Sequence, residues 1–432
     1  MNKLTTPLSK ARTLYNTHLW QGRLILAAII SMLVLIVVRV SLPYTIVYSS
    51  VYWLAKQGIA AQIEDISINV TRGTFNIINA TGTKNGDSVF NVGKASIDWE
   101  WRPLAARTIH VKGIELDDVN LIAEQHSDAL VIAGIVIRDD GTVEQPPEGV
   151  EDDVAWGTSL NQIDFKDLGF CFKQNDGAYD ENKPGNSIID YCGNVGLLAW
   201  QGEFSSGKPD SPAQDNELVL IANGSVKIER LKLFNNKLSA TLINVNDISL
   251  TNIRVDGFDD IGLDKLVIDQ LTLLQGAGHP RHKHAVEFNK LALSDILISN
   301  TDTITINDIV LEKPVISMAL EDSGAYRFEP WLLPQKPEAP DSPGKPGDQN
   351  TDAGTFSIKL SSIKITDTEL CYQQSASSTG NTQALDYCMN LAGTVWKGDI
   401  AIKTANNTNP LALSLMGDLA LSGFLTTNNL LK

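Results

Sequence analysis

The 432-residue chain is short of positive charge. It holds 35 Lys and Arg against 51 Asp and Glu, a net charge of −16, and the first 23 residues alone carry four basic residues and no acid. Proteins that bind DNA or RNA place clustered Lys and Arg against the phosphates. The charge balance therefore excludes nucleic-acid binding and is typical of an acidic, solubilising surface.

Catalytic and nucleotide-binding signatures are missing as well. The chain has no G-x-x-x-x-G-K-[ST] phosphate loop, no dinucleotide fingerprint, no G-x-S-x-G and no H-E-x-x-H. Each of these patterns places a nucleophile, a metal ligand or a row of backbone amides where the chemistry needs it. We therefore expect a protein that is not an enzyme and uses no cofactor.

Long apolar runs are also missing, with one exception. Residues 24–42, from Leu24 to Leu42, read LILAAIISMLVLIVVRVSL and follow Arg23. Nineteen helical residues span roughly 28 Å, close to one bilayer core. Arg39 lies near the far end, where its side chain can reach the interface, and no signal-peptide cleavage site follows. The positive-inside rule predicts cytoplasmic residues 1–23, a transmembrane helix at 24–42, a helical segment at 43–58, and the remainder across the membrane.

Sustained helical periodicity is absent beyond that point. Short segments such as 291–293 and 303–306 alternate apolar with polar or small residues, and Asn, Asp and Gly separate them. Alternation of this kind predicts strands with one apolar and one solvated face. The sequence indicates a mostly β protein built on an elongated, twisted antiparallel sheet.

One sequence pattern, D-Y-C-x-N followed by W-x-G, occurs twice in the chain. Matching residues recur at offsets of 200, 196 and 193, so their order is kept and only loops change length. A repeat of this kind predicts two copies of one structural unit. We assign residues 59–240, with a loop at 139–156, to the first unit, and residues 241–432, with a linker at 334–354, to the second. The repeated residues outside the cysteines are Asp190, Tyr191, Trp200 and Gly202 in the first copy, and Asp386, Tyr387, Trp396 and Gly398 in the second.

The four cysteines divide evenly between the copies. Cys171 and Cys192 belong to the first, and Cys371 and Cys388 to the second. Two disulfides within the copies, formed in an oxidising compartment, are the simplest interpretation. A zinc site is the alternative, but the spacing lacks the C-x-x-C pair of a structural zinc site.

The repeated acidic and aromatic residues admit two interpretations each. Asp190 and Asp386 could act as an acid–base pair, but an Asp beside a cysteine or a strand end commonly stabilises a turn. We favour the structural role for them and for Asp167 and Asp367. Trp200 and Trp396 could stack on a ligand, and the favoured interpretation is that they cover the disulfide of their copy or seal the sheet.

A histidine-rich segment, GHPRHKH, contains His279, His282 and His284. Their spacing can bring imidazoles together around a metal, but Glu287 is the sole acidic or cysteine ligand fewer than ten residues away. We interpret the segment as an exposed basic turn between strands and expect no metal site.

The membrane anchor, the phrase VTRGTFNIINATG and the phrase VGKASIDWEWRPLAARTIHVKGIELDDVNLIAE resemble the AsmA-like proteins of Gram-negative envelopes. The similarity rests on Gly73 before an alternating strand, on Trp101 and Leu104 at a turn, and on apolar periodicity; the cysteine pairs are not part of it. The resemblance implies an inner-membrane anchor, a periplasmic β-groove, and a role in outer-membrane biogenesis through guidance of phospholipids.

The functional expectation follows from both arguments. An alternating sheet that curls without closing leaves an apolar face that needs a ligand or a partner. We expect that face to bind or guide phospholipid acyl chains, with the inner membrane as the anchor and other envelope proteins as further partners. The alternative is a periplasmic scaffold that binds another protein, and a hydrolase is a remote third.

Overall fold

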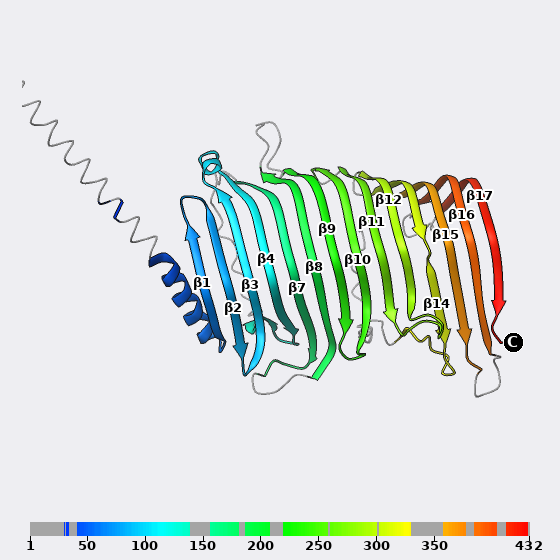
Figure 1. Cartoon of the computed structure of the whole chain (residues 1–432), viewed down its shortest axis with the longest axis horizontal. Coiled ribbons are helices and arrows are strands. Elements are labelled where there is room, and N and C mark those ends of the chain that lie inside the picture. Colours follow the sequence, from blue (N-terminus) through cyan, green and yellow to red (C-terminus); the bar gives the residue numbers. More distant parts are fainter. Residues whose placement is uncertain are drawn as a thin grey trace, which may run out of the picture.

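The structure is a computed structural model of the whole chain (Figure 1). It describes residues 30, 32–33, 41–138, 156–180, 186–207, 219–257, 260–299, 302–329, 357–376, 384–403 and 412–430. The loop predicted at 139–156 lies outside the described residues except for Trp156, and the linker predicted at 334–354 lies wholly outside them.

Residues 41–56 form a helix beside the first strand (Figure 1), where the sequence predicts a helical segment at 43–58. The side chains of Tyr44, Tyr48, Tyr52 and Trp53 on it are exposed. In the part of the chain that the structure describes, no helix combines the length and the apolar content that a bilayer crossing requires. The predicted span at 24–42 falls outside the described residues except at 30, 32–33 and 41–42, so the anchor stays a prediction.

Strands account for nearly all the rest, which confirms the mostly β class. A short 3₁₀ helix, η1 (Arg102–Ala106), occupies the predicted turn near Pro103. The strands are β1 (Ala60–Asn69), β2 (Thr74–Lys84), β3 (Asp87–Glu100), β4 (Thr108–Gln125), β5 (Leu130–Ile132), β6 (Ile135–Ile137), β7 (Gly157–Asp176), β8 (Asn186–Gly207), β9 (Val219–Asn235), β10 (Ala240–Asp256), β11 (Asp260–Gln275), β12 (His284–Ser299), β13 (Thr303–Glu312), β14 (Val315–Leu320), β15 (Ser357–Gln374), β16 (Leu385–Lys403) and β17 (Ala412–Asn428).

All of these strands belong to one long sheet, and they pair mostly in chain order and antiparallel (Figure 1). The expectation of a purely antiparallel sheet is wrong at two places. Strand β4 pairs parallel with β7, and β13 and β14 pair parallel with β15. A parallel pair needs a connection that returns the chain to the end where the previous strand began. Residues 126–156 and 321–356 make these two returns, at matching places in the two halves of the sheet.

The two halves differ where a strand is interrupted. In the first half, β4 runs unbroken through Asp118, whereas its counterpart in the second half divides into β13 and β14 at Lys313 and Pro314. Proline has no N–H to contribute to a ladder, so a strand breaks or bulges where it occurs. Both Asp118 and Lys313 have positive φ, near 50°. The interruption is therefore a stronger form of the same local bend.

Such bends recur in successive strands and define a kink row. Asp117 pairs with Lys166 and Val119 pairs with Leu168, but the positive-φ residues between them, Asp118 and Asp167, form no ladder pair. The kinks of neighbouring strands therefore align. Asn and Asp tolerate the left-handed conformation better than other non-glycine residues. Residues of the kink row with φ between 47° and 54° include Asn79, Asp118, Asp167, Arg230 and Gln270.

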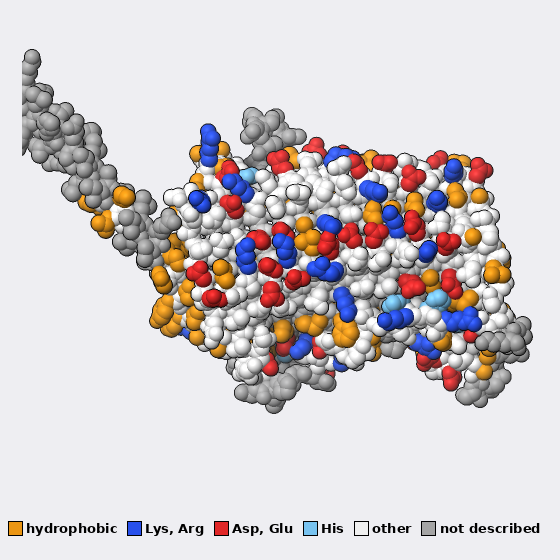
Figure 2. Space-filling view, viewed as in Figure 1, with side chains coloured by type: hydrophobic (Ala, Val, Ile, Leu, Met, Phe, Trp, Pro, Cys, Tyr) orange, Lys and Arg blue, Asp and Glu red, His pale blue; other side chains and the backbone are white. Residues whose placement is uncertain are grey.

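The kink row explains why the sheet curves. The pairing places two consecutive residues of each kinked strand on the same face, where a regular strand alternates. An extra residue lengthens one face relative to the other, so the sheet bends away from the longer face. The longer face is the polar one, and Figure 2 shows it covered with acidic and basic side chains. We call it the outer face and the opposite one the inner face.

No second layer covers the sheet within the described residues. The hydrophobic side chains that are fully buried there are few and mostly small, such as Ala80, Ala222 and Ala292. A two-layer domain would bury a contiguous set of large side chains between its layers. The protein is instead a long single sheet that is curled rather than stacked.

Candidate functional site

The inner face carries uninterrupted apolar rows at right angles to the strands. Following the ladder partners from β1 to β17, every residue of one such row is apolar. The side chains share a face because paired residues and alternate residues of a strand point the same way. The row comprises Ile68, Phe75, Ile97, Ile114, Ile163, Trp200, Val226, Leu250, Leu266, Leu293, Ile309, Ile363, Trp396 and Leu419.

A second row, two residues further along each strand, repeats this composition. It runs from Ile66 to Leu421 and departs from apolar residues only at Thr394. Most side chains of both rows are half-buried, Ile97 is 38% exposed, and the row ends on β17 are more exposed still. Half-buried aliphatic groups over fourteen strands form a far larger apolar area than a soluble monomer usually leaves open.

The outer face is polar and charged at the strand positions that alternate with the apolar rows of the inner face. One row runs Asp65, Ile78, Lys94, Asp117 and Lys166 and continues to acidic and basic residues on later strands. Ion pairs join neighbouring strands there, such as Lys94 Nζ to Glu115 Oε2 at 2.6 Å. Exposed pairs contribute little to stability, so the outer face keeps the sheet soluble rather than holding it together.

Two lysines of the outer face have pKa values that neighbouring carboxylates raise. A hydrogen bond from Lys166 to Asp164, and the charge of that carboxylate, raise the pKa of the ammonium group. Glu229 raises the pKa of Lys227 in the same way, at an Nζ–Oε1 distance of 2.5 Å. Both ammonium groups stay charged at physiological pH.

An apolar pocket of about 260 Å³ opens near the end of the second half of the sheet. Its walls are almost entirely hydrophobic and come from β14, β15, β16 and β17. They include Ile316, Met318, Leu370, Tyr372 and Met389, with the second disulfide beside them. The pocket has the size and chemistry for one end of an apolar chain.

Trp200 and Trp396 hold neighbouring strands together. Each ring lies over a glycine of the next strand, Gly224 or Gly417, where an added Cβ would approach the ring within 2.7 Å or 2.9 Å. Both tryptophans belong to the inner apolar row, eight residues from the cysteine of their strand. These contacts favour the interpretation that they seal the sheet over the one in which they cover a disulfide.

Both predicted disulfides are present. Cys171 bonds Cys192 and Cys371 bonds Cys388, each between directly paired residues of adjacent antiparallel strands. Because the pairing is local, each bond links strands that the ladder already holds side by side. In the second pair both cysteines are buried, at 2% and 3% exposure.

The repeated Asp residues form the same clamp in both halves. Asp190 Oδ1 accepts a 2.6 Å hydrogen bond from the side-chain amide of Asn236, and Asp386 Oδ1 accepts one of 2.5 Å from Asn429. The backbone N–H of each Asn also donates to the carbonyl oxygen of its Asp. The clamp fastens the turn after β9, or the end of β17, to the strand that carries the cysteine. The carboxylates bind side-chain N–H groups, and the carbonyl oxygens of the same residues bind backbone N–H groups, in keeping with the structural interpretation.

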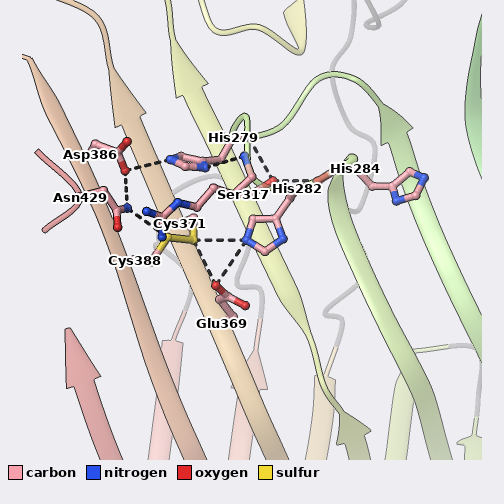
Figure 3. The surroundings of a disulfide bond; sticks show 10 residues. His279, His282, His284, Ser317, Glu369, Cys371, Asp386, Cys388 and Asn429 are labelled. Atoms are coloured by element: carbon pink, nitrogen blue, oxygen red, sulfur yellow. Dashed lines mark hydrogen bonds and ion pairs between the residues drawn. A yellow bond between two sulfur atoms is a disulfide. The ribbon is translucent and has the colours of Figure 1, made fainter. Parts of the chain in front are cut away.

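The histidine segment is not the exposed turn that the sequence indicated. His279 is 1% exposed, and its Nε2 lies 3.0 Å from Asp386 Oδ1 (Figure 3). The backbone N–H of Arg281 donates to Nδ1, which places the proton on Nε2. The backbone N–H of His279 donates to the buried Ser317 Oγ. Residues 276–283 therefore fold onto β14 and β16 and seal the second disulfide, which local sequence could not reveal.

Asp386 shows the electrostatic result of that contact. Its partial burial acts to raise the pKa, but hydrogen bonds from Asn429 and His279 and the nearby charge of Arg281 outweigh burial. The pKa of Asp386 is therefore below its ordinary value.

The predicted anchor residues Arg23, Leu24 and Arg39 lie outside the described residues, and Leu42 is in the helix at 41–56. Tyr191 and Tyr387 pair with Phe172 and Tyr372. Gly202 and Gly398 follow their tryptophans at positive φ, so both repeated glycines take a backbone conformation that other residues rarely adopt.

Comparison with protein-family models and with curated proteins finds no match to this chain. The resemblance to the AsmA-like family therefore stays a prediction that rests on the sequence phrases alone.

Two features of the site escaped sequence reasoning. The kink row needs the ladder register to be seen, although Asp167 and Asp367 at matching places in the repeat were a signal of it. The exposure of β17 depends on which strand lies beside it. Neither property belongs to a single stretch of sequence.

Proposed function

We propose that this protein is a non-enzymatic, membrane-anchored envelope protein whose inner face binds phospholipid acyl chains and guides them along the sheet. The observation that carries the proposal is the set of apolar rows that cross the whole sheet without a charged residue. Each methylene removed from water contributes about 0.8 kcal/mol, so a continuous apolar track holds an acyl chain without polar contacts.

The dimensions support guidance along the long axis. Neighbouring strands lie about 4.8 Å apart, so a row that crosses fourteen strands is roughly 60 Å long, about twice a bilayer core. The helix at 41–56 lies at the β1 end of this track (Figure 1). If residues 24–42 cross the membrane, the track begins at the bilayer surface and points away from it.

The polarity of the two faces supports one working surface. Charged rows occupy the outer face, and apolar rows and the 260 Å³ pocket occupy the inner face or its end. A lipid would meet an apolar path on one side of the sheet only.

A photo-crosslinking amino acid introduced in place of Ile97 tests the proposal in the full-length chain in its native envelope. We expect lipid adducts at this inner position, detected by mass spectrometry. The matched control replaces Asp98, the next residue of β3, which faces outward and should give none. Equal adduct yields at both positions, or none at Ile97 and at Leu266, contradict the proposal.

A charge on the track gives a second test. Leu266→Asp places a carboxylate in the middle of the inner row, whereas Val267→Asp places it one residue away on the outer face. We expect Leu266→Asp to remove the lipid that co-purifies with the chain and Val267→Asp to retain it. Equal lipid content in two folded variants would contradict the assignment of faces.

One observation favours the second candidate function, a scaffold for another protein. The large apolar residues of β17 are 53% to 67% exposed, from Leu413 to Phe424. By the repeat, β17 corresponds to β9 at an offset of 193. In β9 the equivalent residues other than Asn223 are half-buried or buried, and β10 pairs with the other edge of that strand. Within the described residues β17 pairs only with β16, and an apolar strand with one unpaired edge is prone to pair with another strand.

The partner suited to this edge is a protein that offers an antiparallel strand with apolar residues at alternate positions, as β10 does for β9. A crosslinker in place of Leu421 should give a discrete protein adduct, and one at Ile228, the β9 equivalent, should give none. Adducts between two copies of the chain at Leu421 would instead indicate self-pairing of β17.

A further inference from the structure

The second disulfide has metal-binding side chains beside it. His282 Nε2 lies 3.4 Å from Cys371 Sγ and 3.4 Å from Glu369 Oε1, and that oxygen lies 3.5 Å from the same sulfur (Figure 3). Including Cys388 Sγ, the four donor atoms all lie within 4.8 Å of one another. They come from β15, β16 and the loop between β11 and β12.

The backbone holds these donors on one face. Glu369 and Cys371 are two residues apart on β15 and therefore point the same way, and Cys388 is the direct partner of Cys371 on β16. His282 reaches them because the buried His279 fastens its loop to Asp386. Both sulfur atoms are shielded from solvent, and His282 is largely buried, at 14% exposure.

The spacing matches a tetrahedral zinc site. Zinc binds sulfur at about 2.3 Å and nitrogen or oxygen at about 2.0–2.2 Å, so its ligands lie roughly 3.3–3.8 Å from one another. The three distances among His282, Glu369 and Cys371 fall in that range. In the disulfide neither sulfur is a thiolate. Cys371 and Cys388 can therefore bind zinc as thiolates only after the S–S bond between them is broken.

We propose that reduction of the Cys371–Cys388 disulfide opens a zinc site made of both thiolates, His282 and Glu369. The reduction takes up two electrons and two protons from a dithiol, which is oxidised to its own disulfide. When Zn²⁺ binds, the two thiols release their protons to solvent. Thiolate and imidazole together favour zinc over the hard cations Mg²⁺ and Ca²⁺.

The first half of the sheet supplies a natural control. Its disulfide has the same strand pairing, but Gly169 occupies the position of Glu369 at the repeat offset of 200. The turn that corresponds to residues 276–283 is the two-residue turn at 85–86, which is too short to bring a side chain across to the cysteines. Reduction of Cys171–Cys192 should yield two thiols and no comparable site.

The test uses the full-length chain in detergent, reduced by a phosphine, which becomes a phosphine oxide with oxygen from water. After the phosphine is removed without air, Zn²⁺ is added and bound zinc is counted against a chromogenic chelator. We expect one zinc per reduced chain, and one for reduced Cys171→Ser/Cys192→Ser. We expect none for the oxidised chain or for Cys371→Ser/Cys388→Ser. Equal zinc binding by the two double variants, or none by the reduced wild type, overturns the proposal.

Single-ligand variants keep the proposal falsifiable if a double variant fails to fold. Glu369→Gly reproduces the first half of the sheet, and His282→Ala removes the imidazole. Both variants should lower the zinc affinity at least about tenfold, because changes to groups that only contact a metal ligand already cause losses of that size. Cobalt in place of zinc should give sulfur-to-metal absorption in the reduced wild type that shifts in each variant. Unchanged affinity and spectrum in both would show that the two thiols bind metal without these ligands.

Discussion

The ends of β8 and β16 carry the same frame, by which we mean the disulfide together with the Asp–Asn clamp, but the surroundings of the two frames differ. Each has a cross-strand disulfide and an Asp–Asn clamp, but among the described residues only the second has a buried histidine loop folded onto it. The first frame shows that the clamp and the disulfide suffice to close a strand end. The histidine loop is therefore an addition to the duplicated unit, and the fold that both halves share does not require its contacts.

A similar contrast separates β9 from β17. The two strands occupy equivalent places, yet β9 has a strand on each side, whereas β17 pairs only with β16 in the described residues. Their difference in exposure shows how much of the apolar face a second neighbouring strand covers.

The largest expected effect is loss of a disulfide. Cys371→Ala/Cys388→Ala should destabilise the protein by about 3 kcal/mol, the chain-entropy value for a loop of this length. Cys171–Cys192 closes a slightly longer loop, with a sequence separation of 21 against 17. Cys171→Ala/Cys192→Ala should nevertheless cost somewhat less, because these cysteines are less buried and their truncation leaves a smaller cavity. Urea unfolding followed by tryptophan fluorescence measures both. The reverse order would show that the histidine loop adds nothing to the second frame.

Removal of the buried imidazole comes next. His279→Ala should cost about 2–3 kcal/mol, because it deletes a buried side chain and leaves Asp386 with one hydrogen-bond donor fewer. His282→Ala, whose contacts are 3.4 Å long, is the matched control and should cost less than about 1 kcal/mol in the oxidised protein. Equal losses in urea unfolding would contradict the role of His279 as the fastener of the loop.

The tryptophan–glycine contact separates the inner strand from the edge. Gly224→Ala places a methyl 2.7 Å from the Trp200 ring while β8 and β10 hold β9 on both sides, so it should cost about 1–3 kcal/mol. A methyl at Gly417 would lie 2.3 Å from the Lys397 carbonyl oxygen. Gly417→Ala should still cost less, because β17 pairs only with β16 in the described residues and can move outward. Gly113→Ala, whose added methyl meets nothing closer than 3.8 Å, should be nearly neutral in the same unfolding assay.

The smallest effect is a pH dependence. The folded-state pKa of Asp386 is lowered, so the ionised carboxylate stabilises the fold above the unfolded-state pKa of about 3.9, and this stability is lost as the pH falls through the lower folded value. Asp386→Asn should therefore lose less stability than the wild type between pH 4 and more acidic values. Parallel curves of unfolding midpoint against pH would show that the carboxylate is not coupled to folding.

Part of the fold and site could be predicted from local patterns. Alternating residues such as those of β13 indicated strands, because a half-buried strand needs a period of two. The cysteine pairs could be assigned because the repeat placed two in each copy. The return connections could not, since nothing within residues 126–156 states at which end of the sheet the next strand begins.

The histidine loop shows the other limit. The residues around His279 are charged, small or kink-forming, a composition typical of an exposed turn. Its burial depends on Asp386 and Ser317, which lie more than 35 residues away in sequence and meet it only when β12, β14 and β16 are assembled. Sequence patterns measure local preference, and this contact is not local.

The sequence by itself determined that the chain is a duplicated, mostly β protein with two disulfides and one apolar face, since period, repeat and cysteine spacing are properties of the chain. Only the tertiary structure decided that the apolar residues line up into rows across fourteen strands, that a kink row bends them into an inner face, and that one strand end encloses a histidine loop. Those features depend on ladder register, and register is set by the pairing of distant segments.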